Sequence, residues 1–327
     1  MTADAVVLTE MEADEDRVIS PAELFRKWEH GQWQLTELPI ASDAADWAAM
    51  RPYARRELES MIEGFVLGEA AVSNTLSPIA DAAPSLDAHQ YLCTQIADEA
   101  RHTRFFATYL QEMKTSAPTH EEVIADARAS AGEAVSTIFD EELKARTDHV
   151  RFHPEDTRAW YEAVTYYHLM AEGVLAMSVL GAMLSMVRQL RGSLPVLNTG
   201  LRNVIRDESR HMAFGMYAAR EGVRTGHGSA VLNTMMEAIP QVTMALVAPE
   251  RKLPGSSIPP LRAALGKQHA HRYAGARRTL LRRMELIGLQ DSTGDAGRAW
   301  DTAMVAAMAE YERRHGDAHP AGETPAG

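Results

Sequence analysis

Several features are scarce in this chain of 327 residues, and each scarcity excludes a class of protein. A single cysteine, Cys93, leaves no partner for an intrachain disulfide and too few thiolates for a cysteine-based zinc site. The formal net charge of -12 and the lack of a long lysine or arginine block argue against nucleic acid or an anionic lipid surface as a partner. Aromatic residues make up only 6% of the chain, which favours helices over sheets.

The sequence shows neither the pattern of a signal peptide nor that of a membrane-spanning segment. Residues 1–16 are acidic and lack the basic start and apolar run of a signal peptide. The most apolar stretch, residues 163–187, contains His168 and Glu172, and its part after Glu172 is shorter than the roughly 20 residues that a bilayer span needs. We therefore expect a cytoplasmic protein without membrane insertion, in which this stretch is a buried helix.

The abundant residues, among them alanine, leucine and methionine, favour helices, and no strand pattern competes with them. Ser20-Pro21-Ala22-Glu23 has the pattern of a helix start, and turn-forming residues separate the apolar segments that follow. Long helices joined by short breaks predict an all-α bundle. The predicted long helices span residues 43–76 (broken or kinked at Pro52), 87–114, 120–147, 156–190, 196–223, 229–246, 261–287 and 295–314.

Two of these helices carry the same motif. Residues 98–102 (DEARH) and 207–211 (DESRH) both have the pattern Asp-Glu-x-Arg-His. A glutamate and a histidine three positions apart lie on one face of a helix, so both can reach one metal ion. Carboxylate and imidazole together suit iron or manganese, and no sulfur ligand is required.

A Glu-x-x-His pair alone is a weak signal. With 28 glutamates and 13 histidines, about one match is expected by chance. A third match, Glu312 to His315, lies in a polar stretch without the preceding aspartate, and we interpret it as a solvated helix end. The two Asp-Glu-x-Arg-His motifs differ from it because apolar or aromatic residues follow both of them.

Two further glutamates, Glu69 and Glu172, stand alone in apolar segments upstream of the two motifs. A buried ionised carboxylate without a partner is strongly unfavourable, and a cation shared by several carboxylates removes that penalty. Four carboxylates and two imidazoles from four helices are the ligand set of a ferritin-like bundle that holds two metal ions. The predicted metal ligands are Glu69, Glu99, His102, Glu172, Glu208 and His211.

The aspartates of the two motifs are candidates to support the histidines. Metal-bound imidazoles usually donate their second N–H to a carboxylate or carbonyl. Across a site with approximate twofold symmetry, Asp207 would accept from His102 and Asp98 from His211. The alternative is that both are ordinary aspartates on a helix surface.

The expected organisation is one ferritin-like domain over residues 18–315, with the metal-binding core at about 43–224 and additional C-terminal helices. We expect residues 1–17 and 316–327 to be disordered, because the first segment is acidic and the last is rich in glycine, proline and alanine.

At these motifs the chain resembles the ribonucleotide reductase small-subunit superfamily, and within it the ligand-binding oxidases. The likeness covers about residues 20–220. It rests on residues 24–27 (LFRK), 46–47 (DW), 68–72 (GEAAV), 171–173 (AEG) and 211–213 (HMA), beside the two motifs. The resemblance implies a homodimeric oxidase or oxygenase that uses Fe/Fe or Mn/Fe to activate dioxygen and acts on a small or fatty-acid-like molecule.

At a few positions this chain differs from other members of the superfamily, the reductase subunits and the N-oxygenases. Phe106 stands where many reductase subunits have a radical-forming tyrosine, and the C-terminal tail lacks the tyrosine and apolar anchor that reach a reductase large subunit. N-oxygenases of the superfamily, which form nitro, nitroso or azoxy groups, carry a third imidazole where this chain has Val204. An N-oxygenase stays the main alternative; a reductase subunit or an iron-storage protein fits less well.

The ligand-binding oxidases form an ether crosslink between a valine and a tyrosine beside the metals. The corresponding residues are Val72 and Tyr167, which could equally serve as core packing. That family usually has an acidic residue directly after the first glutamate, where this chain has Ala70, so the substrate and the metal pair stay open.

Two weaker patterns have simpler interpretations. His269 and His271 lack acidic neighbours in the sequence, so we expect them to be exposed rather than to bind a metal. Six methionines on the central helices could line a channel, but core packing is the simpler interpretation. They are Met170, Met177, Met183, Met186, Met212 and Met216.

Overall fold

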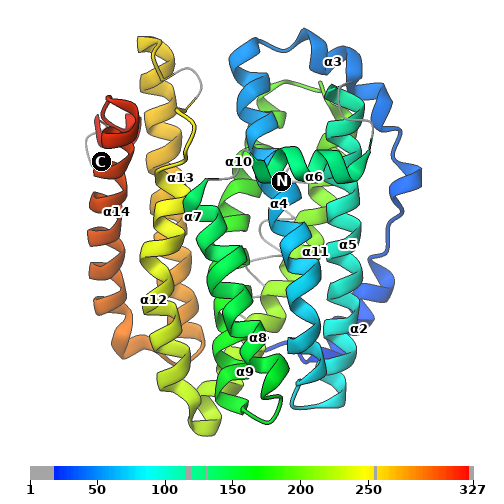
Figure 1. Ribbon diagram of the computed structural model, residues 1–327, viewed down its shortest axis with the longest axis vertical. Helices are drawn as coiled ribbons and strands as arrows, with labels where there is room; N and C mark the ends of the chain where they lie inside the picture. Colours follow the sequence, from blue (N-terminus) through cyan, green and yellow to red (C-terminus); the bar gives the residue numbers. More distant parts are fainter. Residues whose placement is uncertain (1–17, 115–118, 130–131, 254–255, 324–327) are drawn as a thin grey trace.

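The computed structural model describes residues 18–114, 119–129, 132–253 and 256–323, and these residues contain helices and no strand. The helical class predicted from composition is confirmed (Figure 1). The α-helices are α2 (Pro21–His30), α3 (Ala44–Ala49), α4 (Pro52–Asp81), α5 (Leu86–Lys114), α6 (His120–Ala129), α7 (Glu133–Ser136), α8 (Lys144–Phe152), α9 (Thr157–Val164), α10 (Met177–Gln189), α11 (Pro195–Gly222), α12 (Gly228–Val247), α13 (Pro259–Leu286) and α14 (Thr293–His315).

Shorter segments link these helices. Two π-helical segments, η3 (Thr137–Leu143) and η4 (Thr165–Ala176), continue the neighbouring α-helices without a break. A third, η5 (Val223–His227), contains a kink at Gly226, whose φ of 93° is not helical, between α11 and α12. The 3-10 turns are η1 (Leu35–Glu37), η2 (Ile40–Asp43), η6 (Gln290–Ser292) and η7 (Pro320–Glu323). The sequence pattern did not indicate the π-helical segments.

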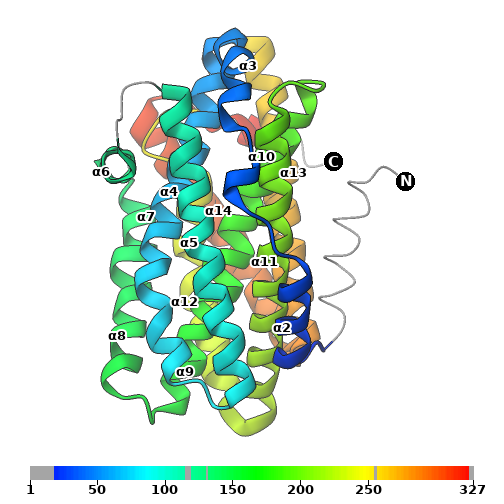
Figure 2. The same ribbon diagram turned by 90° about the vertical axis from the view of Figure 1, so that its right-hand side faces the viewer.

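Four long helices make the central bundle: α4, α5, α11 and the continuous helix that runs from α9 through η4 to α10 (Figures 1 and 2). Helices α12, α13 and α14 form a separate layer on one side, at the left of Figure 1. This layer contacts the bundle mainly where α12 packs on η4. Two apolar core clusters fill the interior, one of them continuing into the C-terminal layer through Trp300 and Leu280.

A buried aspartate joins distant parts of the bundle. The Asp43 carboxylate accepts hydrogen bonds from the backbone N–H groups of Val196 (3.1 Å) and Leu197 (2.8 Å) at the start of α11. It also accepts from the Tyr109 hydroxyl of α5 at 3.0 Å. A carboxylate placed at the unsatisfied N–H groups of a helix start is favourable. Asp43 therefore anchors the first turn of α11 against α5.

Two stretches of helix, Thr157–Gln189 and Pro195–Val247, are long and apolar enough to cross a membrane by length and composition alone. In each, 56% of the most apolar window is buried inside the protein. Such burial is typical of core helices in a soluble protein, and it agrees with the prediction for residues 163–187.

The structure corrects several predicted boundaries. The predicted helix 43–76 is broken at Pro52, as one of the two alternatives expected: α3 ends at Ala49 and Pro52 begins α4, since proline is well placed at a first helical position. Pro78 lies inside α4, which continues to Asp81. The predicted helix 120–147 is two helical stretches, because α6 ends at Ala129 and a new stretch starts at Glu133.

The C-terminal tail is ordered further than its composition suggested. The prediction of disorder is wrong for residues 316–323, where His319 and Ala321 are buried and η7 packs on α13. The remaining predicted disordered segments, 1–17 and 324–327, lie outside the described residues. His269 was predicted to be exposed and is buried, because Tyr273 and His319 pack against its ring.

The contact between Gly200 of α11 and Phe105 of α5 generates a stability prediction. A Cβ atom at Gly200 of α11 would lie 2.0 Å from Cζ of Phe105 on α5, whereas a Cβ at the exposed Gly181 of α10 would meet nothing within 4 Å. Gly200→Ala should destabilise the protein by about 1–3 kcal/mol through overpacking. Gly181→Ala should instead stabilise it by about 0.5–1 kcal/mol through helix propensity. Denaturant unfolding of both metal-free variants would test the pair, and equal effects would contradict the assigned packing.

Candidate metal centre

The four carboxylates and two imidazoles singled out from the sequence converge at the centre of the bundle. Each comes from one of the four long helices, and none is more than 6% exposed. They form two overlapping groups whose donor atoms lie within 4.8 Å of one another. One group is Glu69, Glu99, His102 and Glu208; the other is Glu99, Glu172, Glu208 and His211.

The two histidines aim the same ring atom at the carboxylates. His102 Nδ1 lies 3.3 Å from Glu208 Oε1 and 3.6 Å from Glu69 Oε1. His211 Nδ1 lies 3.1 Å from Glu99 Oε1 and 3.6 Å from Glu172 Oε1. Glu99 and Glu208 belong to both groups, which is the position of carboxylates that bridge two ions.

Several of these buried atoms have no hydrogen-bond partner in the protein: both histidine Nδ1 atoms, Glu172 Oε2 and Glu208 Oε2. Buried polar atoms are rarely left unsatisfied, and those that are call for a ligand or ion. Here the orphaned atoms are carboxylate oxygens and imidazole nitrogens, the types that iron and manganese bind. The cluster is therefore able to hold two metal ions.

A π-helix carries one side of the site. Segment η4 contains both Tyr167 and Glu172, which are five residues apart. The π-helical hydrogen bond spans five residues, so residues at this spacing come to the same side of the helix. Such segments occur often at functional sites. The expected α-helix at 156–190 is thus continuous, but its central turns are wider than predicted.

Tyr167 and two residues that sequence reasoning missed form a buried hydrogen-bond network. The Tyr167 hydroxyl donates to Glu99 Oε1 at 2.9 Å. The Gln95 side-chain amide lies 3.3 Å from that hydroxyl and 3.2 Å from Glu172 Oε1, and its oxygen lies 3.0 Å from His168 Nε2. Burial lowers the pKa of His168 to about 3, so its ring is neutral. The network fixes Tyr167 beside the cluster.

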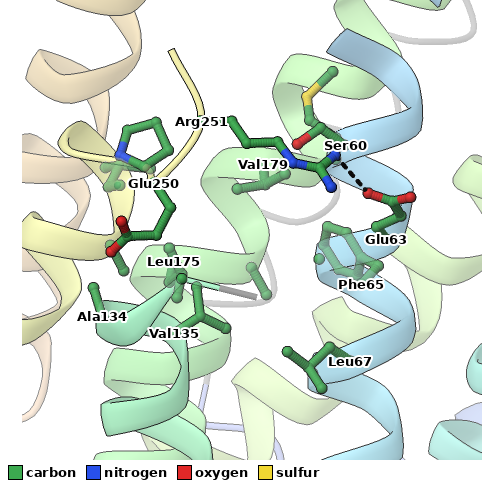
Figure 3. A pocket seen from close by; sticks show the side chains of 18 of the residues that line it. Ser60, Glu63, Phe65, Leu67, Ala134, Val135, Leu175, Val179, Glu250 and Arg251 are labelled. Atoms are coloured by element: carbon green, nitrogen blue, oxygen red, sulfur yellow. Dashed lines mark hydrogen bonds and ion pairs between the residues drawn. The ribbon is translucent and has the colours of Figure 1, made fainter. Parts of the chain in front are cut away.

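A cavity of about 730 Å³ leads from the cluster to the surface, between α4, the η4–α10 helix and the C-terminal layer. Its inner end includes the four glutamates and Val72. Apolar side chains line the middle, among them Phe65, Leu67, Leu175 and Val179 (Figure 3). Phe139 also lines it. None of the six methionines considered from the sequence lines it; Met170, Met183, Met212 and Met216 are buried in the core.

The opening of the cavity is charged. Arg251, from the loop after α12, reaches across to Glu63 of α4 with 3.2 Å between Nη1 and Oε2 (Figure 3). Lys114 of α5 lies 2.7 Å from Glu59 Oε1 and also pairs with Glu63. The cavity therefore has an apolar middle between two polar ends, and its size suits a small-molecule ligand.

Comparison with known proteins places the chain. The sequence profile of the family described as ribonucleotide reductase, small chain, matches residues 19–254. The chain belongs to this family. The match ends before α13 and α14, so most of the C-terminal layer lies beyond it.

Solved structures agree with this membership. A Gly-to-Phe variant of an R2-like ligand-binding oxidase with an anaerobically reconstituted Mn/Fe cofactor is 21% identical, with a TM-score of 0.66 over 82% of this chain and 94% of that chain. A Val-to-Leu variant of such an oxidase, with an aerobically reconstituted Mn/Fe cofactor, is 20% identical, with a TM-score of 0.63 over 82% and 91%. The predicted superfamily and ferritin-like fold are confirmed.

The motif aspartates lie behind the histidines in the crosswise arrangement considered above. Asp207 Oδ2 is 3.2 Å from His102 Nε2, and Asp98 Oδ2 is 3.3 Å from His211 Nε2. Both carboxylates are at most 1% exposed, so they are not surface aspartates. With Nδ1 of each ring facing the cluster, Nε2–H is left to donate to the aspartate. Their effect on bound metals stays a prediction.

Each aspartate also accepts hydrogen bonds from outside the bundle and from the motif arginines. The Trp33 indole donates to Asp207 at 2.7 Å and the Trp28 indole to Asp98 at 3.0 Å. Both tryptophans come from the N-terminal segment around α2, which lies along α5 and α11 in Figure 2. Arg210 lies 2.7 Å from Asp207 and 3.0 Å from Asp98, and Arg101 pairs with both. This pairing explains the arginine in each motif.

Electrostatics within the cluster favour cations. Burial and the nearby carboxylates raise the pKa of Glu69 and of Glu172. Burial opposes ionisation of Glu99 too, but hydrogen bonds from Glu69 and the two histidines outweigh it and lower the pKa of Glu99. Burial likewise opposes charge on His102 and His211, yet the surrounding carboxylates raise the pKa of both rings. Without metal, protons supply the missing positive charge.

Metal binding should therefore release protons. Glu69 and Glu172 hold protons more firmly than ordinary carboxyl groups, and a metal must displace them. The affinity should fall as the pH drops, because protons and metal compete. Calorimetric titration of the metal-free protein with Mn²⁺, in two buffers of different ionisation enthalpy, measures the release. Glu172→Gln should release fewer protons than the wild type, and a heat independent of the buffer would contradict this account.

Proposed function

We propose that this chain is an oxidase or oxygenase that activates dioxygen with two metal ions, Fe/Fe or Mn/Fe, and acts on a small or lipid-like organic molecule. The observation that carries the proposal is the buried cluster of six donor side chains at the inner end of a largely apolar cavity.

In this proposal the ligands divide by group. Glu69 and His102 would hold one ion and Glu172 and His211 the other, and Glu99 and Glu208, which belong to both groups, would be shared by the two. When bound, the metals supply the redox and dioxygen chemistry, as such ions do in other enzymes. The protein contributes the spacing of the donors, through side chains that come from four packed helices.

The surrounding residues prepare the site for this chemistry. The apolar walls around Phe139 and Leu175 limit the access of water to the cluster. Asp98 and Asp207 keep the histidine rings oriented, with Nδ1 toward the metals. Gln95 and Glu99 hold the Tyr167 hydroxyl at the cluster, where it can supply a proton or become modified.

The shape of the cavity supports a ligand with an apolar body. Its apolar middle would bury a hydrocarbon segment, while polar groups at either end would contact the cluster or the charged opening. The similar solved structures are named ligand-binding oxidases with a Mn/Fe cofactor, which supports the proposal that this cavity takes a ligand. A fatty-acid-like molecule is the first candidate to test.

Two positions weaken the alternatives. Phe106 is fully buried, and its ring centroid lies 5.1 Å from that of Phe65 and 5.0 Å from that of Phe105. The position at which many reductase subunits have a radical-forming tyrosine is therefore occupied by a side chain without a hydroxyl group. Val204 is also fully buried and supplies no third imidazole, which argues against an N-oxygenase of the type considered above.

Substitution of the ligands tests the metal assignment. Protein produced with iron and manganese should contain two metal ions per chain, measured by elemental analysis. Glu99→Ala should lose most of the bound metal, since Glu99 belongs to both donor groups, and His211→Ala should lose the ion of its own group. The control is Glu312→Ala, which removes the exposed Glu-x-x-His pair on α14 and should leave the metal content unchanged. Full occupancy in both cluster variants would refute the assignment.

Val72 and Tyr167 provide a separate chemical test. Both lie at the cluster: Val72 lines the cavity beside Glu69, and Tyr167 bonds Glu99. If the ether crosslink forms, the Tyr167 O–H bond and one Val72 C–H bond break and a C–O bond joins the two side chains. The two electrons and two protons released pass to dioxygen, which becomes hydrogen peroxide. Peptide mass spectrometry after aerobic metal loading should then show one crosslinked species, which Tyr167→Phe abolishes. Separate, unmodified peptides in the wild type would exclude the crosslink.

A further inference from the structure

An arginine of the C-terminal layer reaches the π-helix that carries Glu172. Arg283, near the end of α13, is only 3% exposed. Its Nη1 donates a hydrogen bond of 2.7 Å to the backbone carbonyl of Gly173, the residue after Glu172. Arg283 lies beyond residues 19–254, which match the family profile, so the contact comes from the additional part of the chain.

The Gly173 carbonyl stands where the helix changes its spacing. The N–H of Met177 bonds the Glu172 carbonyl, five residues back, at the end of η4. Helix α10 starts at Met177 and returns to bonds that span four residues. A return from five-residue to four-residue spacing passes over one carbonyl, and here that carbonyl is Gly173. A buried carbonyl needs a donor, and the Arg283 guanidinium supplies it.

The absence of a side chain at position 173 permits this contact. A Cβ atom there would lie 2.6 Å from Arg283 Nη1 and 2.7 Å from Cε of Met212. Both distances are shorter than real Cβ contacts, so a larger residue would require the ends of the Arg283 and Met212 side chains to shift. A candidate metal ligand, Glu172, is thus followed directly by the glycine whose carbonyl accepts the hydrogen bond from Arg283.

We propose that Arg283 is a positioning residue, which holds the end of the π-helix in place and so fixes Glu172 in the cluster. Arg283 is itself neither one of the six donor residues nor one of the residues that line the cavity, and its hydrogen bond to η4 is to the backbone. Glu172 belongs to one of the two donor groups, whereas the group of Glu69 and His102 does not include η4. Loss of Arg283 should therefore weaken one metal position far more than the other.

The test measures Mn²⁺ binding in two backgrounds that leave one group complete. His102→Ala keeps the group with Glu172, and His211→Ala keeps the group with Glu69. Adding Arg283→Leu should lower the Mn²⁺ affinity about tenfold in the first background and change it less than about twofold in the second. Arg278→Leu, an exposed arginine on the same helix, is the matched control and should change neither.

Two further variants guard against a general folding defect. Gly173→Ala displaces the guanidinium while Arg283 stays present, and it should reproduce the selective loss. Arg283→Lys keeps a buried cation with one donor group, and it should recover part of the affinity. In the metal-free Arg283→Leu protein, hydrogen exchange should accelerate in the peptide around residues 172–178 and not in α5.

The outcomes separate this proposal from the proposed function on which it rests. Equal losses in both backgrounds, or no loss in either, would overturn the role of Arg283. A wild-type protein that binds no Mn²⁺ would instead overturn the metal site itself. Dioxygen turnover does not enter the measurement, so the identity of the substrate cannot affect the result.

Discussion

The placement of four carboxylates in a dry helical interior is the constraint on which the rest of this structure depends. An isolated ionised carboxylate is strongly destabilised by burial, and four close together repel one another as well. Glu69, Glu99, Glu172 and Glu208 therefore require positive charge among them, which protons supply without metal and two metal ions could supply in their place. The second layer of charge follows the same logic, since buried Asp98 and Asp207 are balanced by Arg101 and Arg210.

The two halves of the site have matching motifs on α5 and α11, but they differ in the helices that carry the other two glutamates. Helices α5 and α11 contribute matching aspartate, glutamate, arginine and histidine residues, and each aspartate serves the histidine of the other helix. The remaining two glutamates differ: Glu69 lies on an ordinary α-helix, while Glu172 lies on a π-helix next to Tyr167 and Gln95. The two metal positions are thus inequivalent, and this asymmetry is a physical basis on which two different metals could be distinguished.

Local patterns were sufficient for the bundle and for the convergence of the six donors, because helical spacing and apolar context are both visible in the sequence. The π-helix was not visible, since a helix that is buried on all sides has no polar face by which to measure its turn. Gln95, Trp28, Trp33 and Arg283 were missed because each acts on a residue that is distant in the chain. The order of residues 316–323 depends on packing against α13, which composition does not report.

The cavity lies between two layers of the protein, and only one of them carries the metal-ligand candidates. Helices α4, α5, α11 and η4 hold the donors, while Leu246, Leu253, Arg272 and Arg314 close the other side from the C-terminal layer. Substitutions in that layer can reshape the ligand space while every donor atom keeps its place. Because of this division, the ligand specificity of the cavity can change by substitution in the C-terminal layer while the metal-ligand candidates are kept.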